Sequence, residues 1–214
     1  MNDFPAHCLW SFGDAVTSSI DSSHLIDMFA AESDSPVVPI EISIVLKRNK
    51  DSSLMGYFVR FHDISQIGFV RKEFFSDENK VLMGEDSLED LLSVSLNLST
   101  KTSWAFKGSR VLVDDCIIMI GHLDHGAGSS KRICLVEIID LKSIDLKRNV
   151  ISPESFQPPE MSSTLIGERL SEIGERYLGR DTMKRGRVVG EWMGGTISTH
   201  QRTQRWIQAV NLLH

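Results

Sequence analysis

Runs rich in Val, Ile and aromatic residues occupy much of the first two thirds of the chain, and they predict β-strands. The run at 38–49 (VPIEISIVLKRN) and the run at 52–63 (SSLMGYFVRFHD) are separated by turn-forming residues, so together they predict a hairpin. Shorter runs at 67–75 and 80–84 predict a third and a fourth strand.

The hydrophobic period changes at Asp86, where the segment DSLEDLLSVSLNL (86–98) predicts a short helix packed on a sheet. Asp86 and Glu89 have the spacing of a capping box, which marks a helix N-terminus. The apolar positions expected along one face of this helix are Leu88, Leu91, Leu92 and Leu96.

The clearest β pattern of the chain follows a turn expected at Lys107 and Gly108. It consists of two strands within 109–123, with a bend at 114–115, and a third strand at 131–141 after a reversal at 124–130. Connections this short exclude parallel crossovers and predict an antiparallel meander. Both faces of these strands are apolar, so one face fills the core and the other must be covered by a helix or by a partner.

Helical patterns lie at both ends of the chain, at 14–31, at 163–179 after a proline-containing loop, and from about Ser198 onward. The expected class is therefore α+β, a mostly antiparallel β-sheet flanked by helices. We expect a single domain over 1–214, made of an N-terminal lead and helix (1–35), a main β region (36–142) with one helix (86–98), and C-terminal helices (160–214).

Composition is that of an ordinary folded protein, with 41% hydrophobic and 24% charged residues. The net charge of −6 is uneven: Lys and Arg outnumber Asp and Glu by three from Ser163 onward, which leaves −9 for the first 162 residues. An acidic body with a mildly basic end lacks the contiguous basic face of nucleic-acid-binding proteins, so we expect protein partners and no direct sequence-specific nucleic-acid binding. No run approaches the roughly 20 apolar residues of a membrane span, so no membrane partner is expected either.

The three cysteines, Cys8, Cys116 and Cys134, lack CxxC spacing and are expected to be reduced and packed, as in intracellular proteins.

The segment GHLDHGAG (121–128) carries the residue types of a metal site or a phosphate cradle. Along an extended strand His122 and Asp124 project to one face while His125 lies in the turn, which leaves too few ligands for a zinc ion. The glycines are too close together for a phosphate loop, and a strand follows instead of a helix. The segment is therefore interpreted as the bend of a hairpin. No catalytic constellation, metal site or cofactor site is expected elsewhere.

The segment from Gly108 to Asp140 resembles a pattern found in subunit 20 of the Mediator complex, a head-module family. In that pattern a strand leads from a Gly-x-Arg start, here Gly108-Ser109-Arg110, to an Asp, here Asp115. A hydrophobic strand then closes on a glycine, here Gly121, and a later strand carries a Val-Glu pair, here Val136-Glu137. The resemblance extends over roughly residues 54–179. Family members usually have a glycine where this chain has Ile133, and residues 180–199 have no counterpart in the pattern.

The resemblance implies a non-enzymatic scaffold: a sheet closing into a barrel-like domain, in a nuclear transcription coactivator. Its implied partners are Mediator subunit 18 in a heterodimer, subunit 8 and other head subunits, and through them the RNA polymerase II machinery. The partner-facing residues expected from the alternation along the last strands are Ile117, Met119, Cys134, Val136 and Ile138, with the equal alternative that these residues form the core and their neighbours form the interface.

Three other interpretations remain open, and one of them is a small-ligand-binding sheet domain, for which no set of polar residues in the sequence defines a pocket. The related subunit 18 has a similar Phe-x-x-Lys-Gly and Leu-Val-Glu arrangement, which compares with Phe106-Lys107-Gly108 and Leu135-Val136-Glu137 here. A barrel-type RNA triphosphatase would instead need several inward-facing carboxylates with a bound metal. Only Glu41 and Glu137 are clear strand glutamates in this chain, and their neighbours are apolar.

Overall fold

The computed structural model describes residues 7–12, 26–27, 31, 35–74, 80–113, 116–126, 132–140, 163–189 and 199–213. Most of the helix expected at 14–31, the bend expected at 114–115 and most of the reversal at 124–130 lie outside these residues.

One antiparallel sheet of nine strands forms the body of the described structure, in the order β5-β4-β3-β2-β6-β7-β8-β1-β9. The strands are β1 (His7–Phe12), β2 (Val38–Asn49), β3 (Met55–Phe61), β4 (Gln66–Arg71), β5 (Leu82–Gly84), β6 (Leu98–Val113), β7 (Cys116–His125), β8 (Arg132–Asp140) and β9 (Arg187–Val188). The helical elements are η1 (Lys72–Phe74), α3 (Ser87–Ser95), α5 (Ser163–Leu178), α6 (Arg180–Met183) and α7 (Thr199–Asn211). The predicted hairpin of β2 and β3 and the meander of β6, β7 and β8 are confirmed.

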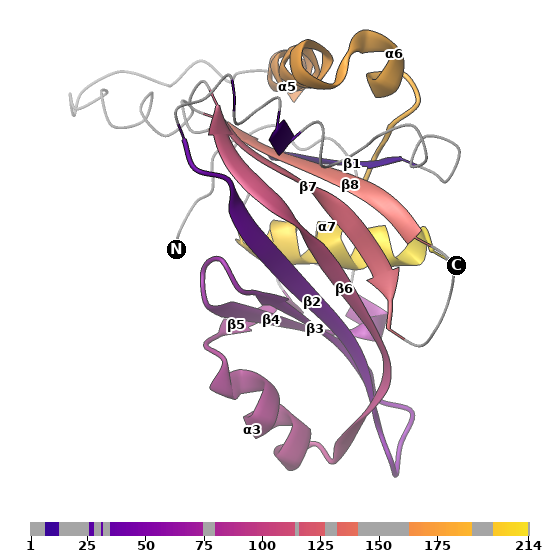
Figure 1. The fold of residues 1–214 in the computed structure, drawn as a ribbon. Helices are drawn as coiled ribbons and strands as arrows, with labels where there is room; N and C mark the ends of the chain where they lie inside the picture. The colour runs from indigo at the N-terminus through magenta and orange to yellow at the C-terminus, as the bar shows by residue number, and fades with distance from the viewer. Residues whose placement is uncertain are drawn as a thin grey trace, which may run out of the picture.

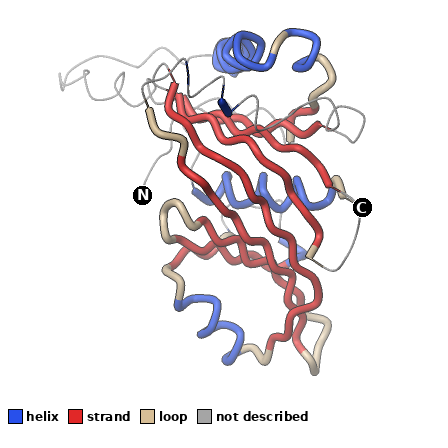
Figure 2. Tube along the Cα trace, in the orientation of Figure 1, coloured by secondary structure: helices blue, strands red, loops and turns tan. Residues whose placement is uncertain are grey.

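The sheet does not close, so the expected barrel was wrong. The edge strands β5 and β9 have three and two residues, and neither pairs with the other in the described chain. Closure would require the two edges to meet with a matched register stagger, which such short strands do not provide. The sheet is instead strongly curved, and α7 lies in its hollow (Figures 1 and 2).

The inner face of the sheet is the face on which α7 packs. Alternate side chains of the long strands point to it, including Ile42, Phe106 and Leu135, and together with Trp206 and Val210 of α7 they form one buried cluster. Nine of the thirteen residues of α7 are buried, so the helix is covered on more than the side that packs on the sheet. The helix predicted from about Ser198 onward is confirmed as α7.

The outer face is covered by two separate helical units at opposite ends of the sheet (Figure 1). Leu170 and Tyr177 of α5 pack with Met183 of α6 over Ile118 and Val136 of the central meander. At the other end, α3 packs on the β3-β4 hairpin. The sequence predicts that the second apolar face of the sheet is covered by a helix or by a partner. This outer face is covered in part by the chain's own helices.

Strand β6 is much longer than predicted and passes straight through the turn expected at Lys107 and Gly108. It pairs along its length with β2 and β7, which satisfies the backbone of its polar first half. Gly108 lies opposite Gly121 at a point where the two strands come unusually close. A Cβ atom at Gly108 would lie 2.2 Å from the Ile120 carbonyl oxygen, and one at Gly121 would lie 2.3 Å from that of Lys107. Both glycines of the family-like pattern are therefore required by packing.

Helix α3 forms where it was predicted, but the burial expected for Leu91 and the expected capping box were both wrong. Leu88 and Leu92 pack against the outer face as expected, but Leu91 faces solvent with 63% of its surface exposed. Asp86 makes no side-chain capping bond, and Glu89 instead bonds to Lys47 and Arg60 on neighbouring strands. A cross-element ion pair thus takes the place of the local capping box.

Candidate functional site

A cluster of buried charged side chains lies between the inner face of the sheet and α7. Its centre is Glu137 of β8, which lies between Met119 of β7 and Leu9 of β1 in the sheet and is fully buried. A buried carboxylate without partners would strongly destabilise the fold, so its hydrogen bonds decide what it can do.

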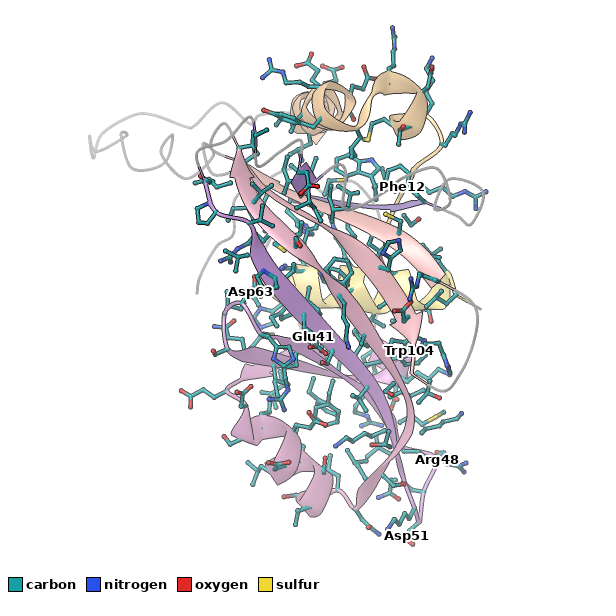
Figure 3. The ribbon with its side chains drawn as sticks, viewed as in Figure 1. Phe12, Glu41, Arg48, Asp51, Asp63 and Trp104 are labelled. Carbon is teal, nitrogen blue, oxygen red and sulfur yellow. The ribbon has the colours of Figure 1, made fainter. Side chains whose placement is uncertain are left out.

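Arg202 of α7 holds both carboxylate oxygens of Glu137. Its Nε donates to Oε1 at 2.9 Å and its Nη2 donates to Oε2 at 2.7 Å, in the two-point geometry that suits a guanidinium and a carboxylate. The other face of the guanidinium lies 4.5 Å from the ring centre of Phe61, and Nη1 lies 3.7 Å from Oδ2 of Asp63. Asp63 is seen near one end of α7 in Figure 3.

Two further donors complete the coordination of Glu137. The indole Nε1 of Trp206, one helical turn after Arg202, donates to Oε1 at 3.2 Å. His7 of β1 places its Nε2 2.5 Å from the same oxygen. The carboxylate of Glu137 therefore accepts four hydrogen bonds, from three residues.

His7 is a buried neutral imidazole, and its two neighbours determine which ring nitrogen carries the proton. Nη1 of Arg205 donates to the His7 carbonyl at 2.9 Å and lies 3.3 Å from Nδ1 of the same residue. A guanidinium only donates, so Nδ1 must accept and the ring proton belongs to Nε2, which donates to Glu137. Burial, together with the nearby charges of Arg205 and Arg202, lowers the pKa of His7 despite the opposing attraction of Glu137.

The other pKa shifts agree with this arrangement. Burial acts to raise the pKa of Glu137, but the charge of Arg202 and the hydrogen bonds outweigh it and the pKa lies well below its usual range. Burial acts to lower the pKa of Arg202, yet the adjacent Glu137 makes the net shift upward. The cluster thus contains two anions, Glu137 and Asp63, and two cations, Arg202 and Arg205, around a neutral histidine.

This arrangement joins distant parts of the chain and leaves its carboxylate no free oxygen. Glu137 is engaged on both oxygens, and Glu41 is exposed on the outer face, opposite Lys107 of β6 (Figure 3). The two strand glutamates named from the sequence therefore point to opposite sides of the sheet. In the part of the chain that the structure describes, no three His, Cys, Asp or Glu side chains gather closely enough to hold a metal ion.

The five residues predicted to face a partner lie on two faces of the sheet. Ile117 and Met119 belong to the inner face, whereas Cys134, Val136 and Ile138 belong to the outer face beneath α5. The register explains this split, because Ile118, not Ile117, is paired with Ile138. All except Ile117 are buried within this chain, and their role in binding a partner stays a prediction.

The segment around His122 lies at the end of the β7-β8 hairpin, as predicted, but His125, which was expected in the turn, is the last residue of β7. Strands β7 and β8 pair up to Asp124 and Arg132, whose side chains form an ion pair with 2.6 Å between Nε and Oδ1. His122 shares the outer face with Asp124, while the ring of His125 meets Trp104 edge-on at 5.6 Å. The two histidines thus lie on opposite faces of the sheet.

The sequence did not predict that a cluster forms around Glu137 from His7, Arg202, Arg205 and Trp206. One signal was available: Arg202 lies on the same helical stripe as Trp206 and Val210, a position where a cation needs a buried anion. Glu137, a lone carboxylate within an apolar strand, was the matching signal. His7 offered none, because strand β1 was not predicted.

No protein-family model matches the chain, and no curated protein matches its sequence. Among solved structures, the Mediator head module of Schizosaccharomyces pombe is similar at 8% identity and a TM-score of 0.43, over 81% of this chain and 94% of that one. The RNA triphosphatase Pct1 of S. pombe is similar at 7% identity and a TM-score of 0.37, over 83% and 86%. A putative adenylate cyclase from Bacillus halodurans is similar at 9% identity and a TM-score of 0.37, over 73% and 95%. All three scores lie below 0.5, so these likenesses establish neither the family nor the activity of this chain.

Across the described helices, none combines the length and the apolar character needed to cross a membrane.

Proposed function

We propose that this chain is a non-enzymatic subunit of the Mediator head module, of the subunit 20 type, that works in the nucleus. In this proposal it forms a heterodimer with subunit 18, contacts subunit 8 and other head subunits, and helps relay regulation to the RNA polymerase II machinery. The proposal rests on the sequence pattern from Gly108 to Asp140. It also rests on the packing of α7 against the inner face, where its side chains bind Glu137.

The proposal that the chain is not an enzyme is supported by the hydrogen bonds of Glu137. A barrel-type triphosphatase requires inward carboxylates that are free to hold a metal, and the inward glutamate here accepts four hydrogen bonds beneath α7. The glycine pair supports the family part. Gly108 and Gly121 occupy the pattern positions, and each is required by the approach of β6 to β7.

Co-expression with individual Mediator head subunits, followed by native mass spectrometry, tests the proposal. The expected product is a one-to-one complex with subunit 18, with no complex formed by an unrelated acidic protein of similar size. A complex with subunit 20 instead would assign the chain to the subunit 18 type. A monodisperse monomer that forms no complex with any head subunit would contradict the proposal.

A further inference from the structure

Helix α3 turns two large apolar side chains toward solvent. Leu91 is 63% exposed and Val94 is 83% exposed, and their i, i+3 spacing puts them side by side on the outer surface of the helix. Scattered apolar residues are common on protein surfaces, but an adjacent pair on a helix whose opposite side already packs is the pattern of an interaction surface. We define the α3 outer surface as Leu91, Val94 and the exposed Asp90 beside them.

The helix that carries this surface is firmly held. Glu89 pairs with Lys47 of β2 at 2.7 Å and with Arg60 of β3 at 3.1 Å, and all three side chains are largely shielded from solvent. Lys47 also donates to Ser93 Oγ at 2.8 Å. A binding surface fixed in advance loses little conformational freedom when a partner docks.

The charged residues on α3 and in the two positions before it are all acidic. Residues 85–95 contain Glu85, Asp86, Glu89 and Asp90 and no Lys or Arg. Arg60 and Lys47 neutralise Asp86 and Glu89, whereas Glu85 and Asp90 are exposed and join no ion pair within the described residues. The α3 outer surface therefore carries one exposed carboxylate, Asp90, and the exposed Glu85 lies two positions before the helix begins.

We propose that the α3 outer surface docks a partner-protein segment that presents apolar side chains flanked by Lys or Arg. The apolar side chains cover Leu91 and Val94, and the cations meet Asp90 and Glu85. This proposal stands independently of the Mediator assignment, because it uses only the exposure, anchoring and charge of α3. It also lies at the end of the sheet away from α5 and α6 (Figure 1).

The test uses a fluorescein-labelled helical peptide built of Leu and Lys, and a matched peptide in which Glu replaces Lys. Binding to the full chain is measured by fluorescence anisotropy. We expect the Leu/Lys peptide to bind, the Leu/Glu peptide not to bind, and the variant Leu91→Ser/Val94→Ser to bind the first about tenfold more weakly or worse. Asp90→Lys should also weaken binding, and added salt should reduce binding to the wild type.

Leu212→Ser is the matched control, because Leu212 is 48% exposed and lies beyond α7, away from α3. It should bind the peptide like the wild type. Thermal unfolding of each variant confirms that the fold is retained. The proposal is overturned if the Leu/Lys peptide does not bind, if Leu91→Ser/Val94→Ser and Leu212→Ser bind it equally, or if Leu91→Ser/Val94→Ser instead abolishes self-association of the chain in sedimentation experiments.

Discussion

Glu137 and Arg202 lie 65 positions apart in the sequence and form a fully buried two-point ion pair, with contacts of 2.9 and 2.7 Å. The pair joins the meander to the last helix, and His7 adds the first strand to the same carboxylate. The inner face of the curved sheet is thus closed by the chain's own helix.

Removing one member of the buried pair should destabilise the fold strongly. We expect Arg202→Met or Glu137→Gln to lower the free energy of unfolding by about 3–5 kcal/mol, because the remaining group stays buried without its partner. Urea unfolding measures this change. The double variant Glu137→Leu/Arg202→Met should be more stable than Arg202→Met alone.

The ion pair between Asp124 and Arg132 provides the control, because both side chains are accessible to solvent. Asp124→Asn should change the free energy of unfolding by about 1 kcal/mol or less. A loss below about 1 kcal/mol for Arg202→Met, equal to that of the control, would contradict the role assigned to the buried pair.

Stability should rise with pH between about 4 and 7, on account of two groups. The pKa of Glu137 is lowered in the folded chain, so the stability it contributes is present above its unfolded pKa and is lost as the pH falls. The pKa of His7 is also lowered, so the unfolded state takes up a proton first as the pH falls below about 6.5, and this favours unfolding.

The variant His7→Gln separates the two contributions. It removes the histidine titration, so the slope of unfolding free energy against pH should flatten between about pH 5 and 7 and persist at lower pH. Urea midpoints across this range measure the slope. Identical slopes for the wild type and for His7→Gln would show that His7 is not held neutral in the folded chain.

Adding a methyl group at the glycine pair should disrupt the sheet. In Gly108→Ala or Gly121→Ala the new Cβ would meet backbone atoms of the neighbouring strand, which cannot rotate away. We expect a loss of about 1–3 kcal/mol or more for each variant, measured by urea unfolding.

Gly84→Ala is the comparison for the glycine pair. Its Cβ would meet only the side chain of Leu88, at 3.0 Å, and that side chain can adjust. The loss should therefore be smaller than at Gly108. Equal losses at Gly84 and Gly108 would count against a close approach of β6 and β7.

Two cysteines should resist alkylation until the chain unfolds. Burial raises the pKa of Cys8 and of Cys134 to about 12, and only the thiolate reacts. At pH 8 we expect iodoacetamide to leave both residues unmodified in the folded chain and to label both in urea, as read by peptide mass spectrometry. Rapid labelling of either thiol without denaturant would show that the outer face opens readily.

The sequence predicted the long central strands because their patterns are local. Val38–Asn49 as a strand and the meander ending at Asp140 follow from β-rich runs and short connections. Strand β1 was missed because it pairs with β8, more than a hundred residues away, and residues 7–12 show no β-typical run of their own. Closure into a barrel was implied by the resemblance and was wrong, because the edge strands β5 and β9 are too short to pair with each other.

The candidate site was harder to predict than the fold, because it is made by partners distant in sequence. Glu137 was noticed as a strand glutamate, but nothing near it in the chain indicates Arg202. The face of each strand residue depends on register, and this is why Ile117 and Ile138 were wrongly placed on one face. Leu91 was assigned to the buried stripe because helical spacing alone cannot tell which border of a stripe is covered.

Hydrogen exchange of the α7 amides measures whether α7 closes the inner face of the sheet, because a helix that closes it permanently must exchange only through large-scale unfolding. Backbone amides within Thr199–Asn211 are followed with and without added tripolyphosphate and Mn²⁺. If α7 closes the inner face, the amides in the middle of α7 exchange with a free energy close to that of global unfolding, and the additives change nothing. Fast exchange of α7, or a change in its protection on adding tripolyphosphate and metal, would contradict this closure and make the inner face a ligand site.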